Sequence, residues 1–170
     1  MIAIRPAEPA DAAALVALAL AVGREPAGWL LTTEAWRPIA DERRYLKAVR
    51  RHNDAAVLVA ADDDQIVGRL SLARDPHPAS AHVADLGMMV AATHRRQGIG
   101  RALLEAAVAW SRGAQVSKLE LHVFPWNEPA IQLYERFGFE REGYRMAHYH
   151  RGDEYADAVL MAIQVDATSV

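Results

Sequence analysis

The sequence predicts one domain of the α/β (α+β) class, built on a mostly antiparallel sheet with a single parallel strand–helix–strand unit. Its 170 residues suit one domain with a substantial core, and no repeat or linker divides residues 1–170. Apolar runs and amphipathic segments alternate in the order β-α-α-β-β-β-α-β-α-β-β. Residues 82–124 read as strand, glycine turn, helix and strand, which is the pattern of a parallel crossover.

Composition excludes several classes of protein. The chain is 52% hydrophobic and 24% charged with a net charge of -3, which is ordinary for a soluble domain and indicates no nucleic-acid or membrane partner. It has no cysteine, which excludes disulfides, a thiolate nucleophile and a thiolate metal site. No signal-peptide pattern opens the chain and no apolar run approaches about 18 residues. We therefore expect a cytoplasmic protein.

The first half of the chain predicts one strand, two helices and a hairpin. Ile2 to Arg5 reads as a short strand, and residues 9–22 read as a helix with Gly23 beyond its end. A second helix is expected from Thr33 to about His52. Residues 55–75 hold two apolar runs around an acidic turn, which predicts a hairpin.

The second half begins with the predicted crossover. "HVADLGMMVA" reads as a strand, and residues 99–112 form an amphipathic helix that Gly113 ends. "SKLELHVF" alternates strictly and predicts a strand. Asn127 is expected to cap a helix that Gly138 closes, before a final hairpin around "RGDE".

The glycine segment "RRQGIG", residues 95–100, lies between a strand and a helix. Glycines at a helix N-terminus let backbone N–H groups approach an anion, as in a pyrophosphate site. A Walker A loop needs Gly-Lys-Ser/Thr, which is absent, and Leu103 stands where a dinucleotide motif has its third glycine. The alternative is a turn that merely starts a helix.

Two motifs in order resemble the GNAT superfamily of acyl-CoA-dependent N-acyltransferases. R-x-x-G-x-G is filled by Arg95, Gly98 and Gly100, and N-x-x-A-x-x-L-Y-x-x-x-G-F begins at Asn127 about thirty residues later. The resemblance covers residues 82–140 most strongly. It implies a mixed sheet of about seven strands flanked by about four helices, with the fourth and fifth strands splayed apart.

The resemblance also implies acetyl-CoA as co-substrate, with no metal. Backbone N–H groups of residues 97–102 would hold its pyrophosphate, and the preceding strand end would pair with the pantetheine arm. The residues implied are Met89, Val90, Arg95, Arg96, Gln97, Gly98, Ile99, Gly100, Arg101 and Ala102. Helical spacing places Asn127, Ala130 and Tyr134 on one face, which suits a ligand-facing stripe. The alternative is a helix cap and a half-buried aromatic ring.

Acyl transfer to an amine requires a proton donor for the leaving thiolate and a base for the attacking ammonium. Tyr134 is the candidate acid, and a direct transfer within a ternary complex is expected. Glu120 and His122 share the polar face of their strand; His122 is the first candidate base, Glu120 the second and Asp85 the third. A structural histidine and a solvated glutamate are the alternatives. His148 and His150 lack a third ligand nearby, so no metal site is expected.

In the family, the segment after the first helix forms one wall of the acceptor site. Trp29, Arg37, Asp85 and Trp126 are the candidate acceptor contacts, with Arg37 suited to a carboxylate. Tryptophans that close the core are the alternative. The expected activity is acetylation of a primary amine on an amino acid or amine metabolite. A protein N-terminal or lysine acetyltransferase and a non-catalytic acyl-CoA-binding module remain open, as does a homodimer.

Overall fold

The computed structural model describes residues 1–31 and 36–165. Within this part of the chain, seven strands form one sheet in the order β1-β2-β3-β4-β5-β7-β6, in which only the β4–β5 pair is parallel. The strands are β1 (Ile2–Pro6), β2 (Ala55–Asp62), β3 (Gln65–Arg74), β4 (Val83–Val90), β5 (Lys118–Val123), β6 (Glu140–Arg151) and β7 (Glu154–Gln164). The four α-helices are α1 (Ala12–Gly23), α2 (Ile39–Val49), α3 (Ile99–Gly113) and α4 (Glu128–Phe137).

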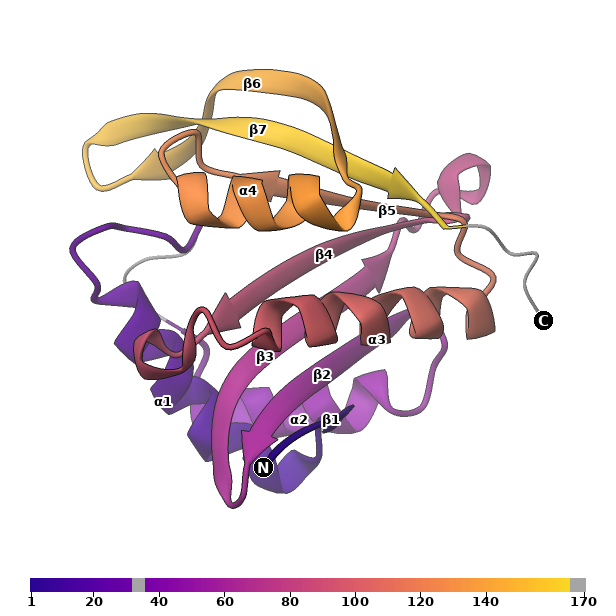
Figure 1. The fold of residues 1–170 in the computed structure, drawn as a ribbon. Helices are drawn as coiled ribbons and strands as arrows, with labels where there is room; N and C mark the ends of the chain where they lie inside the picture. Colours follow the sequence, from indigo (N-terminus) through magenta and orange to yellow (C-terminus); the bar gives the residue numbers. More distant parts are fainter. Residues whose placement is uncertain (32–35, 166–170) are drawn as a thin grey trace.

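The helices cover both faces of the sheet, so the core has two layers. Helices α3 and α4 lie over one face and α1 and α2 over the other (Figure 1). Alternate residues of β2 enter different layers: Leu58 packs toward α3, whereas Val57 and Val59 pack toward α1 and α2. Burial on both faces explains why β2 and β3 read as nearly continuous apolar runs.

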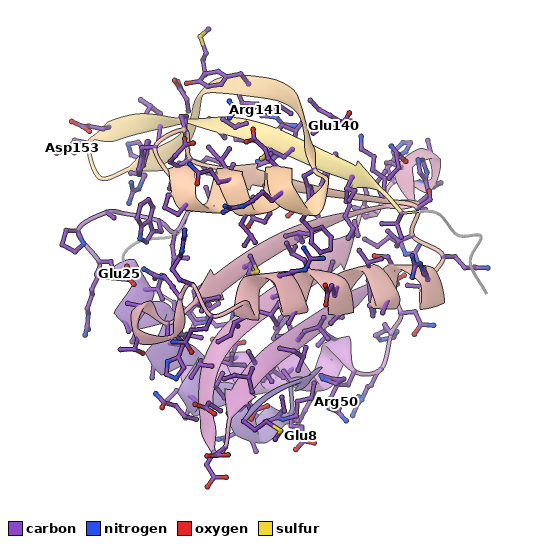
Figure 2. All side chains as sticks on the ribbon, viewed as in Figure 1. Glu8, Glu25, Arg50, Glu140, Arg141 and Asp153 are labelled. Atoms are coloured by element: carbon purple, nitrogen blue, oxygen red, sulfur yellow. The ribbon has the colours of Figure 1, made fainter. Side chains whose placement is uncertain are left out.

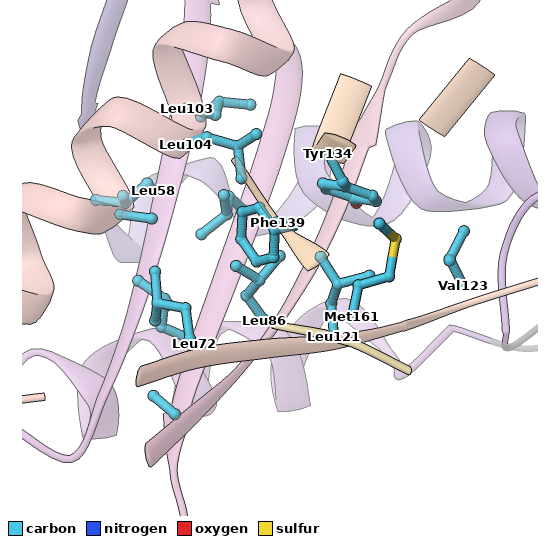
Figure 3. Close-up of a cluster of buried hydrophobic side chains, with 14 of the residues drawn as sticks. Leu58, Leu72, Leu86, Leu103, Leu104, Leu121, Val123, Tyr134, Phe139 and Met161 are labelled. Carbon is cyan, nitrogen blue, oxygen red and sulfur yellow. The ribbon is translucent and has the colours of Figure 1, made fainter. Parts of the chain in front are cut away.

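Packing on the α3–α4 side follows the predicted helix stripe. Leu103 and Leu104 of α3 contribute to a cluster that also holds Phe139, Met161 and the ring of Tyr134 (Figure 3). Gly100 lets the two helices approach, because a Cβ there would lie 2.7 Å from Leu133 Cδ2. Helix α4 is thereby fixed against α3 with Tyr134 turned inward.

The predicted fold class is confirmed, and the ends of the first two helices differ from the prediction. The first helix is expected from Pro9, but residues 9–11 form a 3-10 turn and α1 begins at Ala12. Gly23 is the last residue of α1 and not a residue beyond it, because helical bonding continues from the Arg24 N–H to Leu20. The expected start of the second helix at Thr33 lies outside the described residues, and α2 begins at Ile39. It ends at Val49, before the expected His52.

The parallel pair is short, and it determines where a cleft can form. β4 and β5 pair at three positions, from Val83 with Lys118 to Asp85 with Glu120. β4 then continues to Val90 with β3 alone as its partner among the described strands. β4 and β5 diverge toward their C-terminal ends (Figure 1). The expected splay of the fourth and fifth strands is present.

Candidate active site

The loop between β4 and α3 presents an open helix N-terminus. Arg96 and Gly98 take left-handed conformations, with φ of 64° and 82°, and Gly98 is the N-cap of α3. No atom lies within 4 Å of a Cβ placed on Gly98, so the backbone there faces open space. The first amides of α3 have no helical partner, which is the setting that binds anions. The Ala102 N–H is already bonded to the Gly98 carbonyl.

The arginines in this loop and in the first turn of α3 differ in their partners. Arg95 donates to the Val90 carbonyl at 3.0 Å and makes two bonds of 2.7 and 2.6 Å to Glu25, beyond the end of α1. Glu25 lies beside the loop that precedes α3 (Figure 2). Arg101 pairs with Glu105 at 3.0 Å, whereas Arg96 has an exposed side chain. The charge of Arg95 is therefore neutralised by Glu25.

A cleft of about 950 Å³ connects this loop with the residues around β4 and β5. Fifteen of the residues singled out in the sequence line it: Trp29, Asp85, Met89, Val90, Arg95, Arg96, Gly98, Ile99, Gly100, Arg101, Glu120, His122, Asn127, Ala130 and Tyr134. Arg37, Gln97, Ala102 and Trp126 are not on its wall. A second hollow of about 490 Å³, between α4 and β6, contains none of the residues predicted from sequence.

The cleft brings the two faces of the sheet together at the splay. Leu119 and Leu121 of β5 enter the core on the α3–α4 side, and the alternate residues Glu120 and His122 line the cleft on the other side. Tyr134 reaches the same cleft from α4. The gap between β4 and β5 thus allows groups from opposite faces to meet.

Tyr134 stays protonated at neutral pH. Tyr134 is 6% exposed. Its burial is the main cause, and the nearby charge of Asp85 the second, that raises the pKa of its hydroxyl well above the usual value. Its ring packs against Phe139 at a centroid distance of 5.5 Å. Asn127 accepts a bond from the Ala130 N–H at 3.4 Å, so it caps α4 while it also lines the cleft.

The three candidate bases differ in their surroundings. Although Asp85 is exposed to the solvent of the cleft, the surrounding protein and then the neighbouring Glu120 raise its pKa to about 6. Burial, then Arg145 and His148, lower the pKa of His122. His122 Nδ1 lies 2.6 Å from the Tyr149 hydroxyl. At neutral pH, His122 is neutral and Asp85 is largely ionised.

A buried ion cluster borders the cleft where α2 packs on β3. Glu42 is fully buried, and Arg69 Nη1 donates to its Oε1 at 2.8 Å. Its Oε2 lies 3.2 Å from both Arg37 Nε and Trp36 Nε1. Arg69 also lies beneath the Trp36 ring, with its central carbon 4.8 Å from the ring centroid. We call Trp36 and Arg69 the arginine end of the cleft, and Arg96, Gly98 and Gly100 the glycine end.

Sequence reasoning missed Arg69 and Glu42. The available signal is a single arginine inside the apolar run "IVGRLSLA", a run that by itself predicts only a hairpin strand. A charged residue in the middle of a strand buried on both faces needs a partner. Glu42 is 27 residues away, and the chain gives no spacing that connects the two.

Two side chains, Trp126 and Arg151, contact the segment after α1. Trp126 Nε1 donates to the Ala27 carbonyl at 3.1 Å, and its ring stacks on Phe124 at 4.4 Å. The Arg151 guanidinium lies over Phe124 at 4.8 Å and against Gly28, where a Cβ would be 2.9 Å from Nη2. Trp126 thus attaches the segment after α1 to the loop after β5 from outside the cleft.

No helix within residues 1–31 and 36–165 is both long and apolar enough to cross a membrane. In the same residues, no three His, Asp or Glu side chains gather as a metal site would require.

Residues 18–139 match the model of the acetyltransferase (GNAT) family. The L-amino acid N-acetyltransferase AaaT of Escherichia coli is 38% identical over 109 residues, which cover 62% of this chain and 65% of that protein. The chain therefore matches slightly less than two thirds of this relative's length.

Solved structures share the fold over 95% or more of the chain. A ribosomal-protein-alanine N-acetyltransferase from Brucella melitensis superposes with a TM-score of 0.83 at 29% identity, covering 95% of this chain and 99% of that one. A phosphinothricin acetyltransferase from Sinorhizobium meliloti, solved in complex with acetyl-CoA, gives a TM-score of 0.84 at 17% identity, with 96% and 88% covered.

Proposed function

The chain belongs to the GNAT family of acetyltransferases, and from that premise we propose that it transfers the acetyl group of acetyl-CoA to a primary amine of a small molecule, an amino acid or amine metabolite. One observation carries the proposal. A single cleft, lined in part by the segment after α1, joins an open helix N-terminus, a buried phenol, a pair of carboxylates and an arginine end.

The residues present fit acetyl-CoA in two respects. The open space at Gly98 and the free amides of α3 suit a pyrophosphate, with Arg96 adding charge. The edge of β4 beyond Asp85 has no partner on the β5 side among the described strands, so its backbone is available to the amides of the pantetheine arm. Asn127 and Ala130 line the same stretch from α4.

Acetyl-CoA supplies the reactive thioester when bound, and the chain supplies proton transfer. Tyr134 holds its proton at neutral pH and serves as the acid for the departing sulfur. We assign the base to Asp85 with Glu120, since the two lie side by side on β4 and β5, both line the cleft, and the pKa of Asp85 is raised to about 6. His122 is bonded to Tyr149, and we assign it to orienting that hydroxyl at the cleft wall.

Acetylation of a protein N-terminus is the second candidate, favoured by the Brucella relative. A peptide must enter an open groove and leave it at the far side. The contacts of Trp126 with Ala27 and of Arg151 with Gly28 fix the segment after α1, whose Trp29 lines the cleft, and favour an acceptor that fits inside.

The test is steady-state release of CoA thiol with a panel of acceptors. The panel contains free amino acids, simple alkylamines and an alanyl peptide, each with saturating acetyl-CoA. We expect turnover with at least one small amine and none above background with the peptide. Turnover with the peptide alone would replace the proposal with the second candidate. Acetyl-CoA binding without turnover on any amine would indicate a non-catalytic module.

A further inference from the structure

Arg69 is placed unusually for an arginine that serves only to balance a charge. It is 3% exposed, it lines the cleft, and its Nε has no hydrogen-bond partner among the described residues. A buried donor without a partner costs free energy and calls for an explanation. A bound anion at this wall of the cleft supplies one, because guanidinium groups pair well with carboxylates.

The charge count around Arg69 also leaves room for one anion. Among residues 1–31 and 36–165, Glu42 is the single carboxylate in contact with this cluster, and it contacts two guanidinium groups, those of Arg69 and Arg37. The cluster therefore carries one uncompensated positive charge. Trp36 covers Arg69 on one side, which keeps water away from it and strengthens its attraction for a further anion.

Negative charge lies on the same face of the sheet, toward the splay. In the β3–β4 ladder, Arg69 is opposite Met89, Ser71 is opposite Gly87, and the row of Asp85 follows. The row of Arg69 and the row of Asp85 are four residues apart, which is about 13 Å along a strand. The long arginine side chain can extend across part of this distance. The row between carries only a serine and a glycine, and a Cβ on Gly87 would meet only Ser71 Oγ, at 3.5 Å. The small residues leave space between opposite charges.

We propose that Arg69 binds the carboxylate of the acceptor, so that the enzyme selects α-amino acids whose amine lies toward Asp85 and Glu120. The inference rests on the proposed function and goes further, because it names the residue that distinguishes an amino acid from an amine without a carboxylate. Glu42 acts as a positioning residue that holds the guanidinium at the wall of the cleft.

The experiment compares three acceptors that share one side chain: L-leucine, L-leucinamide and 3-methylbutylamine. An apolar side chain is chosen because Leu30 and Trp36 line this part of the cleft. Values of kcat/KM are measured at saturating acetyl-CoA and corrected for the neutral fraction of each amine. For the wild type we expect kcat/KM for leucine to exceed that for both analogues without a carboxylate by about 10- to 100-fold.

The variants are Arg69→Gln, Arg69→Lys and Arg37→Gln. Arg69→Gln should lower kcat/KM for leucine to the level of the analogues while theirs changes less than about twofold, and Arg69→Lys should keep part of the preference. Arg37→Gln is the matched control, because it also removes a guanidinium that pairs with Glu42 but does so at a residue off the cleft wall. This variant should keep the preference for leucine over the two analogues. Acetyl-CoA affinity reports whether each variant is folded.

Three outcomes would overturn the inference. A wild type without preference for leucine would do so whether or not the variants fold. Equal loss of preference in Arg37→Gln and Arg69→Gln would assign the effect to the charge of the cluster and not to Arg69. Absence of transfer to every amine would remove the proposed function as well, whereas transfer without a carboxylate preference would remove the inference alone.

Discussion

The glycine end of the cleft is built from consecutive backbone groups, and the arginine end from side chains on separate elements. At the glycine end, two left-handed residues and the first turn of α3 form an open surface within a few residues of chain. At the arginine end, Glu42 of α2 meets Arg69 of β3 beneath Trp36. A backbone site tolerates side-chain change except where a side chain fills it. The side-chain site depends on the pairing of Glu42 with Arg69.

The largest effect is expected from Gly98→Glu at the glycine end. The new carboxylate would enter the open space at the α3 N-terminus, repel phosphate and strain a left-handed residue. We expect acetyl-CoA affinity measured by calorimetry to fall by about 100-fold or more. Gly113→Glu, at the other end of α3, is the control and should bind normally. Equal affinity in both variants would contradict an anion site at Gly98.

Tyr134→Phe tests the group between the two ends. Because phenylalanine keeps the ring packing against Phe139, the variant should fold and bind acetyl-CoA as the wild type does. Loss of a general acid should lower kcat by about 100-fold. Single-turnover and steady-state assays give kcat, and calorimetry gives the affinity. A kcat that is unchanged from pH 6 to pH 9 would exclude Tyr134 as the acid.

Gly87→Ala tests the space between the ends. A Cβ there makes only an ordinary contact with Ser71 Oγ, so the fold should be retained while the methyl group narrows the cleft. We expect KM for the acceptor to rise by about tenfold with acetyl-CoA affinity unchanged. Gly143→Ala on β6, where a Cβ would lie 4.0 Å from Leu160, is the matched control. An unaltered KM would place the acceptor elsewhere.

The acidic limb of the rate–pH profile identifies the base. The raised pKa of Asp85, about 6, means that its carboxylate gains a proton as pH falls through 6, so activity should decline below that value. Between pH 7 and pH 5 we expect a fall of about tenfold in kcat/KM. Asp85→Asn should lower activity and abolish this limb, whereas His122→Gln should retain it. The opposite pattern would return the role to His122.

The smallest effect concerns the contact that joins the glycine loop to the end of α1. Glu25→Gln removes the partner of Arg95, which is partly exposed, so the free energy of unfolding should fall by less than about 1 kcal/mol. Thermal unfolding at low and high salt measures it, and the difference from wild type should shrink as salt rises. A difference that is independent of salt would show that charge is not the cause.

Features of the cleft that depend on local spacing could be predicted from the sequence, whereas contacts between distant residues could not. The glycine loop and the cap at Asn127 follow from local spacing, and the structure has both at the predicted positions. The alternation of β5 correctly separated core leucines from cleft residues. Spacing could not show that Arg95 is bonded to Glu25, 70 residues earlier. It could not place Arg37 off the cleft wall, because that depends on how α2 packs on β3.

The buried pair of Glu42 and Arg69 has a consequence for evolutionary change. A descendant that replaced Arg69 alone would leave Glu42 with Arg37 and Trp36 only, and one that replaced Glu42 alone would leave a buried guanidinium without its carboxylate. Either single step passes through a less stable protein. New acceptor preferences are therefore reached most easily by two linked substitutions, or by changes at Ser71 and Gly87, which carry no such dependence.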